Sequence, residues 1–186
     1  MSLKKTTIAA LLAASGLVAS SASMAQSADP KWYVGGSLGQ SEANGSCPAG
    51  FSCDFKDTAF KIFGGYRINR NFAAEAFWGE WGKISITTGG VSATAKSRTL
   101  GVAGLGILPL GNQFELFGKL GIGSTKVDAT GTAGGLSASA SDSGSDVLYG
   151  VGAGYNFSRN LGVRAEWERL NDSDQDIISI GIQYRF

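Results

Sequence analysis

The stretch from Asp176 to Phe186 reads D-I-I-S-I-G-I-Q-Y-R-F. Every second residue from Ile178 onward is large and apolar, whereas the residues between are mostly small or polar. Because side chains alternate faces along a strand, this period predicts a β-strand with one apolar face. A transmembrane strand needs about 9–11 residues, and aromatic side chains such as Tyr184 and Phe186 concentrate where it meets the membrane interface. The stretch is therefore predicted to cross a membrane as one strand of a barrel.

The same two-residue period recurs upstream, in segments 31–40, 58–68, 72–82, 97–108, 114–125, 147–157 and 161–170. Tight turns follow three of these segments, and longer polar loops are predicted at 41–57, 83–96, 126–146 and 171–175. The Ala-, Gly- and Ser-rich segment 126–146 is expected to be mobile. Short connections at one end and long ones at the other are typical of outer-membrane barrels. We therefore predict an eight-stranded antiparallel up-and-down transmembrane β-barrel whose first and last strands pair.

Two segments depart from strict alternation. In 97–108, Leu100 and Val102 oppose Leu105 and Ile107 in parity, which predicts a bulge near Gly104. In 72–82, Phe77 and Trp81 share the parity of Glu75, so one face mixes aromatic and charged residues.

The charged residues of these segments indicate which face meets lipid. They share faces with glycines, opposite the apolar residues: Lys61, Arg67, Glu75, Glu115, Lys119, Arg164, Glu166, Glu168 and Arg185. A soluble barrel such as a lipocalin would instead enclose its apolar face. A charge facing lipid costs about 2–4 kcal/mol near the midplane, and the near-equal numbers of both signs suit an internal ion-pair network. We therefore predict that the charges point inward and the apolar face meets lipid.

The first residues have the pattern of an export signal. Lys4 and Lys5 precede a short apolar run, and Ser23-Met24-Ala25 places small residues where a signal peptidase cuts. The predicted organisation is a signal peptide at 1–25 and a barrel at 26–186. Export implies an oxidising compartment, so Cys47 and Cys53 are predicted to form a local disulfide, with a reactive thiol pair as the alternative.

Composition and motifs exclude several functions. The chain has 16 Lys and Arg against 15 Asp and Glu with no basic patch interleaved with aromatics, so no nucleic-acid partner is expected. Gly150, Gly152 and Gly154 lie within a strand and are not a nucleotide-binding loop. The chain has no His, and no enzymatic activity, cofactor or metal is predicted. The scattered aspartates are expected to form a solvated anionic surface rather than a calcium site: Asp128, Asp142, Asp146, Asp172, Asp174 and Asp176.

Residues 31–186 resemble the OmpA-like transmembrane β-barrel family. The resemblance rests on Y-G-V-G-A-G-Y-N-F at 149–157, V-R-A-E-W at 163–167 and the final Y-R-F. It implies that an inward Glu75 pairs with an inward Arg164, and that Lys119 and Glu166 are further inward charges. The best-studied member of the family has a further acidic residue where this chain has Gly154. The resemblance also implies that Tyr184 and Phe186 belong to a signal for the barrel-assembly machinery.

Together these patterns predict a non-enzymatic protein of the cell outer membrane that supports envelope integrity. Its expected partners are outer-membrane lipid, lipopolysaccharide, the barrel-assembly machinery and an external partner of the loops. Two alternatives stay open: a small ion or solute pore, and an adhesin or receptor module acting through loops 41–57 and 126–146.

Overall fold

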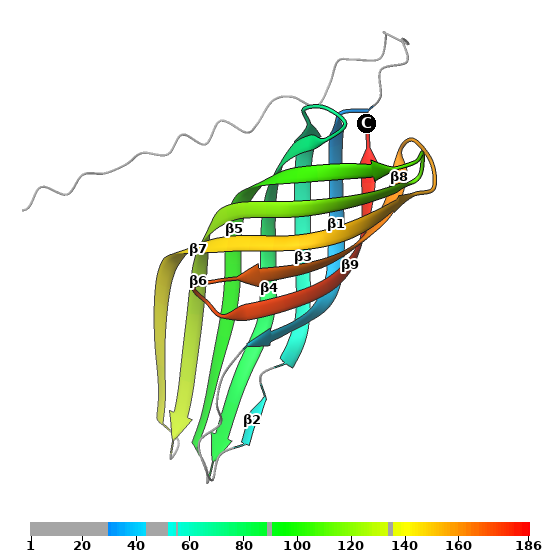
Figure 1. Cartoon of the computed structure of the whole chain (residues 1–186). Helices are drawn as coiled ribbons and strands as arrows, with labels where there is room; N and C mark the ends of the chain where they lie inside the picture. Colours follow the sequence, from blue (N-terminus) through cyan, green and yellow to red (C-terminus); the bar gives the residue numbers. More distant parts are fainter. Residues whose placement is uncertain (1–29, 44–51, 55, 89–90, 134–135) are drawn as a thin grey trace, which may run out of the picture.

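The computed structural model describes residues 30–43, 52–54, 56–88, 91–133 and 136–186. Eight long antiparallel strands form a closed ring, and one short strand, β2, adds to the side of β4 (Figure 1). The strands are β1 Trp32–Ala43, β2 Ser52–Asp54, β3 Lys56–Arg67, β4 Phe72–Thr88, β5 Val91–Leu110, β6 Phe114–Ala133, β7 Leu136–Asn156, β8 Leu161–Leu170 and β9 Gln175–Arg185. No helix in the described part of the chain is long and apolar enough to cross a membrane.

The ring closes where the first and last strands meet. β1 pairs with β9 in an unbroken register that runs from Tyr33 opposite Arg185 to Ala43 opposite Gln175. The pairing continues to the final residue, because the Phe186 amide donates to the Trp32 carbonyl at 2.9 Å and the Trp32 amide donates back at 3.2 Å. The predicted eight-stranded barrel with paired first and last strands is confirmed.

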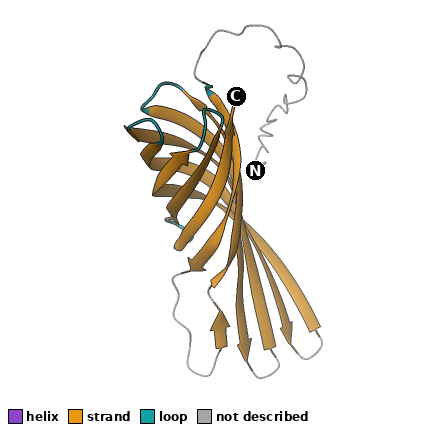
Figure 2. Ribbon diagram, turned by 90° about the vertical axis from the view of Figure 1, so that its right-hand side faces the viewer, coloured by secondary structure: helices purple, strands orange, loops and turns teal. Residues whose placement is uncertain are grey.

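Two of the predicted loops, 83–96 and 126–146, are wrong, and the predicted loop 41–57 is wrong in part, because 41–43, 52–54 and 56–57 belong to strands. Residues 83–88 and 91–96 pair as one hairpin of β4 and β5, and 123–133 and 136–146 pair as one hairpin of β6 and β7. These hairpins project beyond the barrel at the end opposite Phe186 (Figure 2), and β2 pairs with residues 85–87 at their edge. The physical reason is that the Ser- and Thr-rich segments alternate with Ala and Val, which is a strand pattern despite its low complexity. We call these projecting strand ends the extension.

The predicted bulge near Gly104 is also wrong. β5 keeps one continuous register with both neighbours through Gly104, and the shift lies instead on β4, between Glu80 and Lys83. Gly82 within that shift has a φ of 78°, a conformation that glycine adopts without steric cost. The parity change in β5 has another cause: Leu105 and Ile107 point into the barrel, where they are buried.

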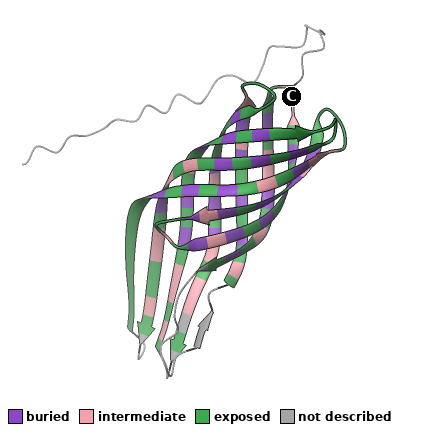
Figure 3. Cartoon of the chain, viewed as in Figure 1, coloured by how far each residue is buried: buried purple, intermediate pink, exposed green. Residues whose placement is uncertain are grey.

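The two faces of each strand meet different surroundings (Figure 3). On β9, Ile178 and Ile180 are 66% and 69% exposed, whereas Ile177 and Ser179 are 1% and 5% exposed. Large apolar residues cover the outside of the barrel, and the buried interior contains Lys, Arg and Glu side chains. This is the reverse of a soluble barrel and fits a wall surrounded by lipid, as predicted.

Candidate functional site: the charged interior

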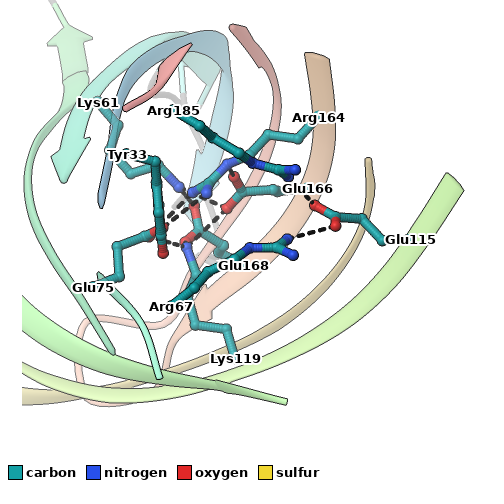
Figure 4. A network of polar contacts seen from close by, with 10 residues as sticks. All are labelled: Tyr33, Lys61, Arg67, Glu75, Glu115, Lys119, Arg164, Glu166, Glu168 and Arg185. Atoms are coloured by element: carbon teal, nitrogen blue, oxygen red, sulfur yellow. Dashed lines mark hydrogen bonds and ion pairs between the residues drawn. The ribbon is translucent and has the colours of Figure 1, made fainter. Parts of the chain in front are cut away.

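Six charged side chains converge in the middle of the barrel (Figure 4), three of them cationic and three anionic. They come from four strands: Lys61 on β3, Glu75 on β4, Lys119 on β6, and Arg164, Glu166 and Glu168 on β8. All are at least 96% buried. We call this set the central network. Because its formal charges cancel, a group that costs several kcal/mol to bury alone is compensated by its neighbours.

Glu75 contacts three different donors. Arg164 binds both of its carboxylate oxygens, with Nη1 2.7 Å from Oε2 and Nη2 3.1 Å from Oε1. Lys119 Nζ lies 2.8 Å from Oε1, and the Tyr33 hydroxyl donates to Oε2 at 3.0 Å. The Arg164 guanidinium also stacks on the Phe63 ring at 3.5 Å, which adds a cation–π contact. These contacts fix the carboxylate from β1, β6 and β8 at once.

The two lysines link the remaining carboxylates. Lys61 Nζ lies 2.8 Å from Glu166 and 2.5 Å from Glu168. Lys119 Nζ lies 2.9 Å from each of the same two residues. Arg164 also forms an ion pair with Glu166, its neighbour two positions along β8. The central network therefore crosses the lumen and ties β3, β4 and β6 to β8.

A second ion-pair cluster lies nearer to the tight turns. Glu115 on β6 accepts from Arg67 on β3 at 2.5 Å and from Arg185 on β9 at 2.9 Å. The Glu115 side chain is 9% exposed, and those of Arg67 and Arg185 are 20% and 11% exposed. Partial exposure weakens these pairs relative to those of the central network, because water and salt screen them.

Aromatic rings and aliphatic side chains also pack inside the barrel, and glycines make space for the rings. A Cβ atom at Gly152 would lie 2.3 Å from the Phe117 ring, and one at Gly35 would lie 2.3 Å from the Phe63 ring. Each of these glycines is the cross-strand partner of the ring that it accommodates. A cavity of about 10 Å³ lies between the two charged clusters, roughly the space of one water. The lumen is therefore packed along this length.

A further polar group closes the end near the extension. Asp146 on β7 is 2% exposed, and its carboxylate accepts from the Asp172 amide at 2.9 Å and from the Ser173 hydroxyl. These contacts hold the β8–β9 turn against β7. The expectation that Asp146 belongs to a solvated surface is therefore wrong, because Asp146 lies on β7 with its side chain buried inside the barrel.

The four residues expected as an interior network lie together. Glu75, Lys119, Arg164 and Glu166 contact one another directly. Sequence reasoning placed the charges inward but did not assign a role to Tyr33, whose position on the glycine-rich face of β1 was the available signal.

The other predicted sites have different outcomes. Tyr184 and Phe186 lie on the outward face at the end with the tight turns, 51% and 59% exposed. The predicted disulfide and signal peptide lie outside the described residues, because Cys47 and residues 1–25 fall there, although the backbone of Cys53 belongs to β2.

Comparison with known proteins agrees with this architecture. Residues 9–186 match the family described as outer membrane protein beta-barrel domain. Outer membrane protein A of Yersinia pseudotuberculosis is 29% identical over 201 residues, which cover 99% of this chain. The chain spans 56% of the length of that relative.

Solved structures of low sequence identity share the fold. Ail, the attachment invasion locus protein of Yersinia pestis, matches with a TM-score of 0.62 and 20% identity over 86% of this chain and 100% of its own. Neisserial surface protein A matches with a TM-score of 0.57 and 16% identity, over 83% of this chain and 97% of its own. The chain thus belongs to the outer-membrane β-barrel family, and its location is the cell outer membrane.

Proposed function

We propose that this member of the outer-membrane β-barrel family is a non-enzymatic structural protein that supports envelope integrity. The packed, ion-paired lumen carries the proposal. A central network that ties four strands across the barrel resists deformation of the wall, and the cavity of about 10 Å³ beside it has room for roughly one water. In this proposal a signal peptide at 1–25 directs export, the barrel-assembly machinery recognises Tyr184 and Phe186, and lipopolysaccharide surrounds the outer half of the wall.

A deletion strain tests the proposal. Cells that lack the gene are expected to leak a periplasmic enzyme and to become sensitive to SDS and vancomycin. Wild-type protein from a plasmid is expected to restore the barrier, whereas a Glu75→Gln variant is expected to restore it less well at high temperature. An intact barrier in the deletion strain would refute the structural role.

An adhesin or receptor role is the second candidate, and the extension favours it. The hairpins of β4–β5 and β6–β7 project beyond the closed part of the barrel and carry exposed side chains. A structural neighbour, Ail, has been solved in complex with the heparin analogue sucrose octasulfate. Replacing 84–95 and 127–142 by tight turns is expected to leave the barrel folded and to abolish binding to host cells if this role holds. Unchanged binding would exclude it.

The pore alternative has a direct electrical test. Because the central network crosses the lumen, we expect the purified barrel to show no single-channel conductance in a planar bilayer. Steady single-channel conductance of the wild-type protein would favour the pore and contradict a packed lumen.

A further inference from the structure

Four basic side chains gather on the outward face of the wall, where the extension begins. They are Lys83 on β4, Lys96 and Arg98 on β5, and Lys126 on β6, and all are exposed. The strand register places like charges directly opposite each other: Lys83 faces Lys96, and Arg98 faces Lys126. Such cross-strand pairs destabilise a sheet unless an anion lies between them. We call these four residues the basic quartet.

Nearby acids neutralise only part of this charge. Asp128 forms ion pairs with Arg98 and, at 3.7 Å, with Lys126. The hydrogen bond from Arg98 holds the pKa of the Asp128 carboxyl below its ordinary value, so Asp128 stays ionised and is already matched. Glu80 is the cross-strand partner of Arg98. Asp57 on β3 also lies close, because its Oδ2 accepts from the backbone amide of Lys83 at 2.7 Å. Four cations against three carboxylates leave a net charge of +1, and neither Lys83 nor Lys96 has a side-chain ion-pair partner among the described residues.

The opposite wall provides a contrast. Arg169 on β8 also lies toward the outward face at this end of the barrel, and it is matched by Asp174 at 2.6 Å and Asp176 at 3.0 Å. The unmatched charge is therefore a property of the β4–β6 wall.

An apolar groove lies on the same wall, further into the membrane. Its volume is about 740 Å³, and small residues form its floor, among them Gly64, Ala74, Ala76 and Gly104. Trp32 borders one side, and Leu120 borders the other. On β5, Gly104 is six positions from Arg98, which is about 20 Å along the strand and roughly 15 Å in depth at a tilt near 40°. The groove thus begins below the basic quartet and extends to about the middle of the bilayer.

We propose that the basic quartet and the groove form one binding site for a phosphorylated glycolipid of the outer leaflet, the lipid A part of lipopolysaccharide. The phosphate lies between Lys83 and Lys96, where it removes the like-charge contact. An acyl chain of the same molecule fills the groove, which opens only toward hydrocarbon. The site rests on the proposed function in one respect, since the extension must face outward and place the quartet at the outer leaflet.

Binding of purified lipid A to the mature barrel in phosphatidylcholine nanodiscs tests the site, with native mass spectrometry to count bound lipids. Wild-type protein is expected to retain one lipid A. Lys83→Gln with Lys96→Gln is expected to weaken binding about 25-fold, since each basic residue near an anionic surface contributes about fivefold. Gly104→Leu fills the groove without a clash, because the nearest atom to a Cβ there is the Leu120 carbonyl oxygen at 4.0 Å. It is expected to weaken binding without changing the charge.

Two control variants separate this site from general lipid contact. Arg169→Gln removes a cation that is already paired, and Ala165→Leu enlarges the lipid-facing surface of β8, so both are expected to bind as wild type does. A heat-modifiability gel confirms that each variant is folded. Wild-type affinity in either the double-lysine variant or Gly104→Leu would overturn the combined site, as would equal binding of phosphatidylglycerol. An intact barrier in the deletion strain would refute the structural role but would not change the lipid A binding measured in vitro. The two proposals can therefore be refuted independently.

Discussion

Replacing Glu75 by Gln tests whether the central network stabilises the barrel. The substitution preserves shape but removes one negative charge from a buried set that contains three cations and three anions. Arg164 would keep Glu166, and Lys119 would keep Glu166 and Glu168, but the buried set would acquire a net charge of +1. Removing one partner of a buried ion pair costs about 3–5 kcal/mol, and we expect a loss in that range.

Urea unfolding in short-chain phosphatidylcholine vesicles, followed by tryptophan fluorescence, measures the free energy of unfolding. Glu42→Gln is the matched control, because Glu42 pairs with Lys56 at 3.0 Å through side chains that are 53% and 63% exposed. An exposed pair of this kind contributes about 0–1 kcal/mol. If the two Gln variants unfold at the same urea concentration, the central network is not a source of stability.

A double variant separates charge from packing. Glu75→Gln combined with Arg164→Gln restores a neutral interior, with two lysines facing two glutamates. We expect the double variant to lose less free energy than the sum of the two single variants, by about 0.5–3 kcal/mol. Strict additivity would show that the bidentate pair carries no coupling.

Two further substitutions test the packing of the lumen and the contacts of Asp146 with the β8–β9 turn. Gly152→Ala is expected to destabilise the barrel by about 1–3 kcal/mol, because the added Cβ would overlap the Phe117 ring. Gly106→Ala is the control and is expected to be neutral, because a Cβ at this lipid-facing position has no atom within 4 Å. Equal melting temperatures of the two variants on a heat-modifiability gel would contradict this expectation. Asp146→Asn is expected to release the β8–β9 turn, since an amide is a weaker acceptor for the Asp172 amide at 2.9 Å. Hydrogen exchange of residues 171–174 should then accelerate while that of β9 stays slow, and unchanged protection of the turn would count against the role of Asp146.

The alternation of large apolar residues was sufficient to predict the barrel, because a two-residue period determines which face each side chain occupies. It also placed Glu75 and Arg164 inward. The period could not separate apolar residues that meet lipid from those that fill the lumen. Phe77 and Trp81 therefore looked irregular, and both are 2% exposed inside the barrel. Space for each ring comes from a glycine. Gly101 lies opposite Phe77 in the strand register, and Gly79 lies under the Trp81 ring two positions earlier on the same strand.

The extension was missed for a related reason. Serine, threonine and alanine in segment 126–146 give little hydrophobic contrast, so the segment resembled a loop. Val127 opposite Asp142 and Lys126 opposite Ser143 nevertheless continue the membrane register without a break. The strands continue because their neighbours do, and each added pair extends an existing ladder instead of starting a new one. Pairing partners, and not local composition, determine where these strands end.

The same contacts that stabilise the lumen also close it. Arg164 lies between Glu75 and the Phe63 ring, so a conducting state would have to move Arg164 away from both. If that movement costs about 4 kcal/mol, the open state is populated roughly a thousandfold less than the closed one. Selection for a stable barrel and selection for an easily opened pore therefore act in opposite directions on Glu75 and Arg164. Tyr33, Lys119 and Phe63 contact this pair from three further strands, so the proposed structural role requires that opening the lumen break all of these contacts together.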